Sequence, residues 1–284
     1  MKKLSSLLLL AFACFSFFLG PPHKEVFTLK KFEKKLALIK PGLYAGKYEA
    51  TNLEYNEFLK SIESESGTFE KARIHNENWK MGGQYNEPFA KTYHSHPAYA
   101  AYPVVNVSHE GAVAFCEWLT ESYNAYPKRK FKKVKFRLPT EEEWAYAASG
   151  GHENAVFPWG GYYLMNSKGE VLANFRRVQQ TRCKKKTADG LIELQESELS
   201  PNDAWALPQA HLIAPSLSYF PNGFGIYNAS GNAAEMLAEP GRTKGGSWAS
   251  YGYYLRIDAE DEFAGFEKPS PQIGFRYFME VVEE

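Results

Sequence analysis

The residues best suited to chemistry lie in a turn-rich stretch, residues 221–236, which carries four oxygen donors at close spacing. Asn and Gly favour the positive-φ turns that let a backbone curl and direct several oxygens toward one point. The donors are the Asn228 amide, the Gly231 and Ala233 carbonyls and the Glu235 carboxylate. Hard cations such as calcium bind six to eight oxygens of this mixed origin. The spacing therefore indicates either a calcium site or a plain Asn-Gly loop with a solvated Glu235.

Several longer motifs accompany this stretch. KGGSW begins at Lys244 and IGFR ends at Arg276, while RLPTEEEWAYAA begins at Arg137 and PWG ends at Gly160. Together with PNGFGIYNASGNAAEM, these motifs resemble the formylglycine-generating enzyme (sulfatase-modifying factor) family. They stand in the family's order, and the resemblance extends from about residue 46 to residue 278.

The resemblance implies an α+β fold, an irregular and loop-rich single domain related to the C-type lectin fold. It places the donor set of residues 228–235 on a family calcium site. It also implies a second calcium site, for which the matching or plausible residues are Asn174, Phe175, Asp189 and Leu191. An insertion at about residues 192–211 separates this second set from the later motifs.

The family's oxidase chemistry depends on copper, which two cysteines five residues apart bind just after the Gly-Gly-Ser segment. Copper(I) is a soft ion that prefers thiolate ligands. In this chain the matching positions are Ser250 and Leu255. A hydroxyl and an isobutyl group cannot replace two thiolates, so the resemblance implies the fold without the catalytic pair, and copper is not expected.

Length and composition are compatible with a large single core. The chain has 284 residues, of which 44% are hydrophobic and 15% aromatic, which is ample for a sizeable core. Lys and Arg together equal Asp and Glu at 33 each. This balance gives no indication of a nucleic-acid partner.

The N-terminus carries the pattern of an export signal. Lys2 and Lys3 precede an apolar run from Leu4 to Leu19, about 16 residues and therefore short for a membrane-spanning helix. Cys14 follows Ala-Phe-Ala in a loose lipoprotein cleavage motif, so residues 1–20 are either a lipoprotein signal, an ordinary signal or an uncleaved anchor. We expect the protein in the periplasm or at the outer membrane, with a lipid anchor as one alternative, and residues 21–42 as a linker that includes a first short strand.

Local patterns predict several elements. Thr51 with Glu54, and Thr140 with Glu143, form capping boxes at the start of two helices. A further helix is expected over residues 110–123. Alternation of apolar residues with lysines near residues 128–136 predicts a strand with one solvated face. Residues 63–99 are predicted as a long loop region.

Three further features contain side chains that could take part in chemistry, but we predict structural roles for them. His94 and His96 are predicted as surface loop residues, because no third metal ligand is evident. Cys116 is predicted as a buried apolar residue, with a disulfide to Cys183 as the alternative. The acidic residues 258–262 are predicted as a solvated loop, because no histidine partner is near.

These observations support three functional hypotheses. The first is a non-catalytic envelope protein that binds other envelope proteins, like exported family members of gliding-motility and secretion machinery. The second is an oxidase that makes formylglycine in sulfatases, which Ser250 and Leu255 oppose. The third is a module that binds glycans or other ligands through its loops.

Overall fold

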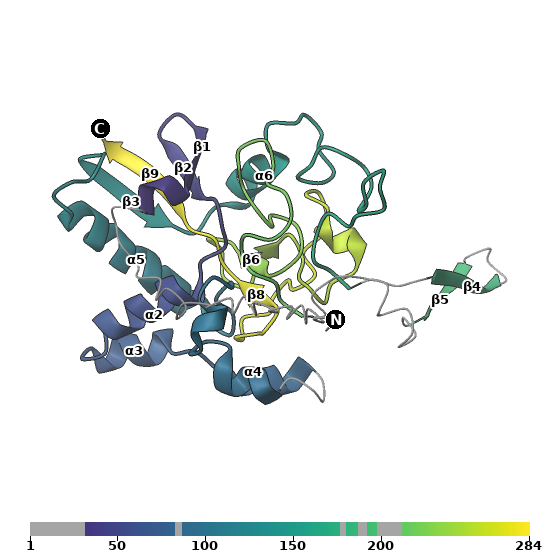
Figure 1. The fold of residues 1–284 in the computed structure, drawn as a ribbon, viewed down its shortest axis with the longest axis horizontal. Helices are drawn as coiled ribbons and strands as arrows, with labels where there is room; N and C mark the ends of the chain where they lie inside the picture. Colours follow the sequence, from purple (N-terminus) through teal and green to yellow (C-terminus); the bar gives the residue numbers. More distant parts are fainter. Residues whose placement is uncertain (1–31, 83–86, 177–179, 187–191, 198–211) are drawn as a thin grey trace, which may run out of the picture.

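The computed structural model describes residues 32–82, 87–176, 180–186, 192–197 and 212–284. Its largest sheet has four antiparallel strands in the order β1-β2-β9-β3 (Figure 1). The strands are β1 (Leu36–Lys40), β2 (Leu43–Gly46), β3 (Lys133–Arg137) and β9 (Phe278–Glu283). The first and last parts of the described chain therefore pair within one sheet.

The sheet buries both faces because its apolar residues alternate. Phe136 and Met279 lie opposite one another and face a core shared with helix α5 (His109–Ala125). Ala45 and Phe278, one step along, face a second core that contains Trp144. A period of two residues places neighbouring side chains on opposite faces of a strand. The predicted strand is confirmed as β3, whose Lys133 and Lys135 are exposed.

Two of the helices begin where their capping residues indicate. Thr51 and Glu54, and likewise Thr140 and Glu143, make both hydrogen bonds of a capping box. The helix expected at residues 110–123 is confirmed as α5. The α-helices are α2 (Asn52–Ser61), α3 (Ser66–Ala72), α4 (Glu87–Thr92), α5 (His109–Ala125) and α6 (Glu141–Ser149), and the short 3-10 helices are η1 (Glu33–Lys35), η2 (Asn76–Gly82), η3 (Pro97–Tyr99) and η4 (Gly252–Leu255).

The prediction of a long loop over residues 63–99 is wrong, because α3, α4, η2 and η3 lie within that range. Aromatic packing joins the segments of η2 and α4, whereas α3 packs against α5. The rings of Trp79 and Tyr93 are 4.8 Å apart, and both side chains are buried. Aromatic contacts at this distance stabilise short helices that have weak patterns of their own.

Two smaller sheets complete the part of the chain that the structure describes. Strands β6 (Ala234–Met236), β7 (Thr243–Lys244) and β8 (Ile273–Gly274) form one, in which β6 and β8 are parallel. Strands β4 (Gln180–Lys186) and β5 (Ile192–Ser197) form a hairpin. The predicted insertion thus contributes β5, and its remainder, residues 198–211, lies outside the described residues.

The predicted linker, residues 21–42, extends too far. Phe32 is 1% exposed and stacks on Tyr277, with 5.5 Å between ring centroids. The strand β1 follows within the sheet. Residues 32–42 therefore belong to the domain, because pairing in the sheet buries the alternating apolar side chains of β1.

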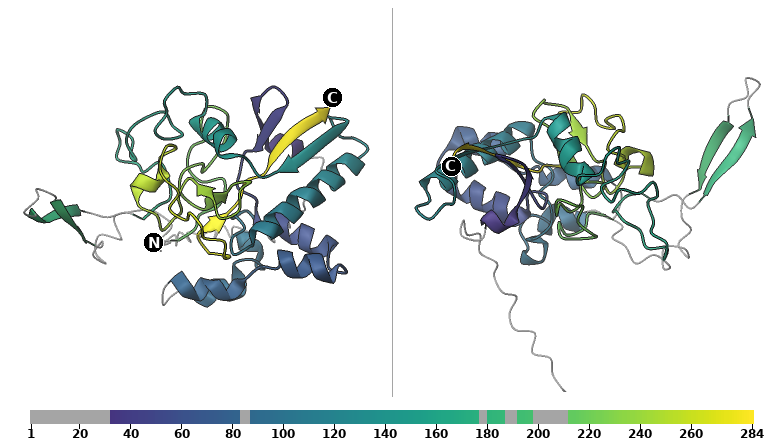
Figure 2. Two further views of the ribbon diagram at one scale, coloured as in Figure 1. Left: turned by 180° about the vertical axis from the view of Figure 1, so that it is seen from behind. Right: turned by 90° about the horizontal axis from the view of Figure 1, so that it is seen from above.

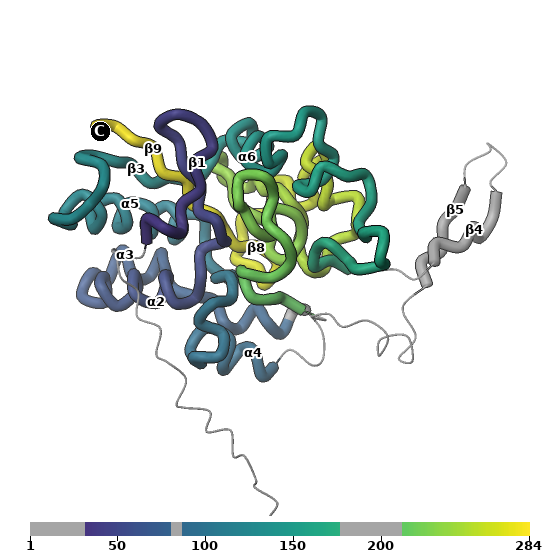
Figure 3. The backbone as a smooth tube through the Cα atoms, turned by 45° about the horizontal axis from the view of Figure 1, so that its top comes forward, coloured from purple at the N-terminus to yellow at the C-terminus, as the bar shows by residue number. Residues whose placement is uncertain are grey.

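The arrangement separates a helical side from a loop side. Helices α2 to α5 lie on one side of the molecule, and the long connections around β6 and β8 lie on the other (Figures 2 and 3). Among the described residues, no helix is both long enough and apolar enough to cross a membrane.

Candidate functional site

The loop side contains Ser250, which lies at the centre of a hydrogen-bond network. The Ser247 amide donates to Ser250 Oγ at 2.7 Å, and the two hydroxyl oxygens are 2.9 Å apart. Ser250 Oγ also donates to the Glu262 carboxylate, and Ser247 Oγ donates to Gln272 Oε1 at 3.1 Å. Both serines are fully buried. The network therefore ties the loop after β7 to the segments at residues 262 and 272.

Leu255 serves a different purpose five residues later. Its side chain is fully buried in an apolar cluster with Phe157 and Ala173. Its carbonyl oxygen accepts a hydrogen bond from Ser230 Oγ at 2.6 Å. Leu255 thus anchors η4 to the domain by packing, and its side chain has no ligand atom to offer.

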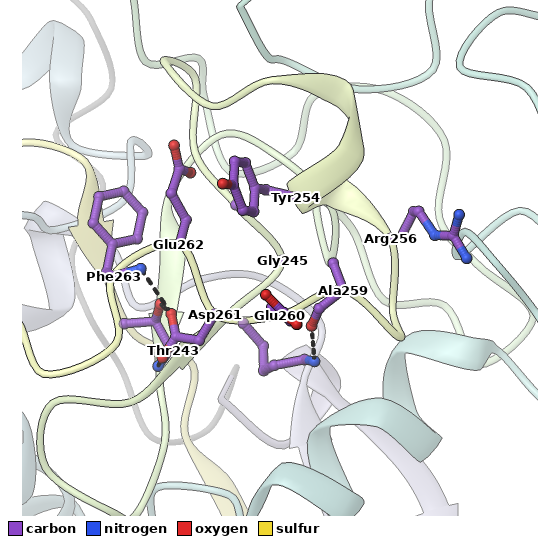
Figure 4. A pocket seen from close by; sticks show the side chains of 11 residues that line it. Thr243, Gly245, Tyr254, Arg256, Ala259, Glu260, Asp261, Glu262 and Phe263 are labelled. Atoms are coloured by element: carbon purple, nitrogen blue, oxygen red, sulfur yellow. Dashed lines mark hydrogen bonds between the residues drawn. The ribbon is translucent and has the colours of Figure 1, made fainter. Parts of the chain in front are cut away.

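A small cavity of about 10 Å³ lies beside this loop and is lined by Gly245, Tyr254 and Glu262, among others. This volume accommodates about one water molecule. Figure 4 shows Arg256 directed away from the other side chains that are drawn. The exposed part of Arg256 pairs with Asp258 at 2.7 Å. The cavity therefore has no room for a peptide side chain.

The acidic segment beside the cavity was predicted to be a solvated loop, but one of its side chains is buried. The Asp261 side chain is 2% exposed and accepts hydrogen bonds from the Thr243 amide at 2.7 Å and the Thr243 hydroxyl at 2.6 Å. Partial burial, together with the nearby charge of Asp261, raises the pKa of Glu262. The prediction is wrong for Asp261, because a buried pairing with β7 holds it.

A second buried polar cluster surrounds Glu49, whose role the sequence analysis missed. The carboxylate accepts hydrogen bonds from the Asn228 amide at 3.2 Å, the Asn232 amide at 3.0 and 3.1 Å, and the Ala233 backbone amide at 3.2 Å. Burial raises the pKa of Glu49 to about 8, although the charge of Arg276 opposes the rise. The amide groups that donate to Glu49 are neutral, so they satisfy its oxygens without supplying a countercharge.

The predicted calcium ligands divide between this cluster and a neighbouring ion pair. Asn228 and Ala233 contact Glu49, as described. The Glu235 carboxylate instead meets the Arg276 guanidinium at 2.5 Å and the Trp144 indole nitrogen at 2.7 Å. Glu235 and Arg276 are both buried. The prediction of a plain solvated Glu235 is therefore wrong.

Gly231 lies where only glycine fits. Its φ is +78°, and a Cβ atom there would come within 2.2 Å of the Asn174 carbonyl oxygen. Asn174 also donates to Asn232 Oδ1 at 3.1 Å and to the Leu212 carbonyl at 2.7 Å. The structure thus brings Asn174, from the second predicted set, against the first. Phe175 follows it in the chain, and Asp189 and Leu191 lie outside the described residues, as does the lipidation candidate Cys14.

The prediction that His94 lies on the surface is wrong. The side chain is 6% exposed, and its Nδ1 atom is 2.8 Å from Asn52 Oδ1. Because the Asn52 amide nitrogen donates to two backbone carbonyls, its oxygen accepts and His94 Nδ1 carries the proton. Burial lowers the pKa of His94 to about 3. His96 is exposed and caps η3, which agrees with its predicted surface position.

Cys116, on α5, is a free thiol buried in the core, which confirms the core prediction over the disulfide alternative. Burial raises the pKa of this thiol well above its usual value. A neutral, inaccessible thiol is a poor nucleophile and a poor metal ligand. Cys116 is therefore not a candidate nucleophile or metal ligand.

Comparison with protein families decides where this fold belongs. Residues 33–281 match the FGE-sulfatase family, described as the sulfatase-modifying factor enzyme 1-like domain. The chain belongs to this family. The match covers the sheet, both buried polar clusters and the loop that carries Ser250, so it confirms the α+β, loop-rich fold that the motifs predicted.

Relatives in the family include both active and inactive proteins by name. The chain is 27% identical over 229 residues to the formylglycine-generating enzyme of Mus musculus, covering 70% of this chain and 49% of the relative. It is 32% identical over 136 residues to the inactive C-alpha-formylglycine-generating enzyme 2 of the same species, covering 48% and 32%. A crystal structure of CarF covers 84% of this chain and 86% of CarF, at a TM-score of 0.49 and 19% identity.

The chain spans about half the length or less of these two curated relatives. Family membership alone therefore does not define its activity. For copper, the residues at the implied positions do not fit, because Ser250 is a hydroxyl held within a hydrogen-bond network and Leu255 is packed in an apolar cluster.

Proposed function

We propose that this chain is a non-catalytic, exported envelope protein that uses the family fold as a structural or binding scaffold. The observation that carries the proposal is the pair Ser250 and Leu255, which occupy the positions matching the oxidase cysteines. Ser250 uses its hydroxyl to hold Glu262 and Ser247 in place. Leu255 stabilises η4 by burial. Both positions serve the stability of the loop, and neither offers a soft ligand.

Exposed aromatic side chains on the loop side support a binding role. Tyr162 is 74% exposed, Tyr163 is 78% exposed and Tyr253 is 53% exposed. The loop that carries Tyr162 and Tyr163 reaches η4, because Leu164 lies against the backbone of Gly252. Exposed aromatic groups are typical of interaction surfaces. We infer that envelope proteins, such as components of a secretion or gliding assembly, bind here.

A pull-down with the full chain from envelope extracts tests this partner. We expect a defined envelope protein to be recovered by the wild-type chain and lost with the variant Tyr162→Ser/Tyr163→Ser. A matched variant at another exposed aromatic residue, Tyr146→Ser on α6, should retain it. Specific binding of a glycan at the tyrosines, with no protein partner, would favour a ligand-binding module instead.

Installing the missing thiols tests the catalytic part of the proposal. We expect wild-type protein to bind no copper(I) at this loop and the double variant Ser250→Cys/Leu255→Cys to gain a tight copper(I) site, seen as a new thiolate-to-copper absorption band. The single variant Ser250→Cys, which has one thiol, is the matched control. All three proteins share the remaining cysteines, so a difference reports on this loop.

Activity of the unaltered protein would contradict the proposal. We expect no conversion of a Cys-x-Pro-x-Arg peptide to formylglycine by the wild-type chain, with or without copper. Aldehyde product formed by the wild-type chain, and abolished by Ser250→Ala, would establish an oxidase that does not need the cysteine pair.

Calcium enters the proposal as a structural ion at the oxygens of Asn228, Gly231 and Ala233. The buried Arg276 already neutralises Glu235, which limits the charge this site can offer a cation. We expect added calcium to raise the melting temperature and a chelator to lower it again. An unchanged melting temperature would mean that the ion pair stabilises this segment without a metal.

A further inference from the structure

The domain begins beside the connection between α5 and β3. Phe32 packs against Phe136 on β3, with 5.6 Å between ring centroids. The Glu33 carboxylate accepts hydrogen bonds from the Tyr123 hydroxyl at 2.6 Å and from the Lys130 backbone amide at 2.7 Å. These contacts fix the place where the preceding segment enters the domain.

Four exposed lysines surround this entry point, and we call them the basic surface. They are Lys34 on η1 and Lys128, Lys130 and Lys132 between α5 and β3. No ion pair joins any of them to another residue within the described ranges, whereas Lys133 and Lys135 lie opposite Glu283 and Glu280. The Lys130 ammonium lies 4.8 Å from the ring centroid of Phe131. The basic surface therefore presents unmatched positive charge next to an aromatic ring.

The sequence before the entry point supplies an apolar run. Residues 4–19 are mostly apolar, and the twelve residues from 20 to 31 separate them from Phe32. Twelve residues reach about 40 Å at full extension. Any bilayer that holds the apolar run therefore lies within reach of the basic surface.

We propose that the basic surface binds the anionic headgroups of the bilayer that holds the N-terminal segment, so that the domain faces the membrane with the α5–β3 connection. The inference rests on the proposed function, and of the alternatives for residues 1–20 it takes those that leave the N-terminus attached to a bilayer, a lipoprotein signal or an uncleaved anchor. A single acyl chain binds a bilayer reversibly, and a cluster of lysines supplies the second contribution that makes attachment stable. Each lysine near an anionic surface raises affinity roughly fivefold.

Lysine footprinting of the full chain on vesicles tests the proposal. The protein is reconstituted on phosphatidylcholine vesicles, with and without phosphatidylglycerol, and acetylated by a membrane-impermeant reagent before mass spectrometry. We expect acetylation of Lys128, Lys130 and Lys132 to fall about fivefold or more on the anionic vesicles and to recover at high salt. The exposed lysines Lys91 and Lys168 should react equally on both.

A charge-reversed variant separates the basic surface from the anchor. In Lys128→Glu/Lys130→Glu/Lys132→Glu, we expect Lys34 to lose its protection, while Lys91→Glu/Lys168→Glu should keep it. Equal acetylation on neutral and anionic vesicles, or protection without phosphatidylglycerol, would overturn the proposal. Failure of the full chain to float with either vesicle would also overturn it, and would leave the copper and peptide tests of the proposed function unaffected.

Discussion

Replacing Arg276 with methionine is expected to destabilise the protein by about 3–5 kcal/mol, because it leaves a buried carboxylate without its countercharge. Arg276 is 2% exposed and contacts Glu235 through two nitrogens, at 2.5 and 3.0 Å. It also donates to the Gly46 carbonyl and the Tyr227 carbonyl, each at 2.8 Å. A single side chain thus connects the small sheet, the end of β2 and the turn-rich stretch.

Urea unfolding of Arg276→Met and of a matched variant, Arg137→Met, measures this effect. Arg137 pairs with Glu143 at 2.6 Å but is 26% exposed, so its loss should cost about 1 kcal/mol or less. The double variant Arg276→Met/Glu235→Met should recover much of the stability, because neither charge then remains buried. Equal losses for the two single variants would refute the central role of the buried pair.

Glu49 is expected to make the protein less stable as pH rises from about 5 to 8. Burial raises the pKa of Glu49 from an ordinary 4.5 to about 8 in the folded protein, so the folded state keeps a proton that the unfolded chain releases. The stabilisation is complete below pH 4.5 and is lost as pH rises through 8. The change is on the order of a few kcal/mol.

The difference between wild type and Glu49→Gln isolates this contribution, because glutamine does not titrate. His94, whose pKa burial lowers to about 3, acts in the opposite direction by losing stability as the pH falls below 6.5, and it is common to both proteins. Between pH 5 and pH 8, the free energy of unfolding of the wild type should fall relative to that of the variant, and the difference should stop changing above about pH 8. A carboxyl carbon titration of Glu49 by NMR with a midpoint near 4 would contradict the assignment, whether or not the variant folds well.

Local sequence determined the elements with strong start signals and regular periods. The two capping boxes placed α2 and α6 correctly, because the side chain and backbone groups that form them lie within four residues. The alternating segment became β3, and the helix over residues 110–123 became α5. Within residues 63–99, η2 and α4 escaped prediction, because contacts such as that between Trp79 and Tyr93 join their segments and neither element has a long periodic pattern.

The motifs also determined the family, and with it the fold, since they recur in a fixed order over most of the chain. The resemblance also implied that Ser250 and Leu255 stand at the positions of the family's catalytic cysteines. What those positions do instead required the structure, because Ser250 and Glu262 meet across a loop closure that no local pattern describes.

Only the tertiary structure decided the partners of the buried charges. Glu49 meets Asn232 across 183 positions of sequence, and Arg276 meets Gly46 across 230. A charged residue in a sequence looks the same whether it will be solvated or buried, because its cost depends on the groups that folding brings around it. For this protein, the motifs in the sequence indicated the family, and the fold determined which groups surround Ser250, Glu49 and Arg276.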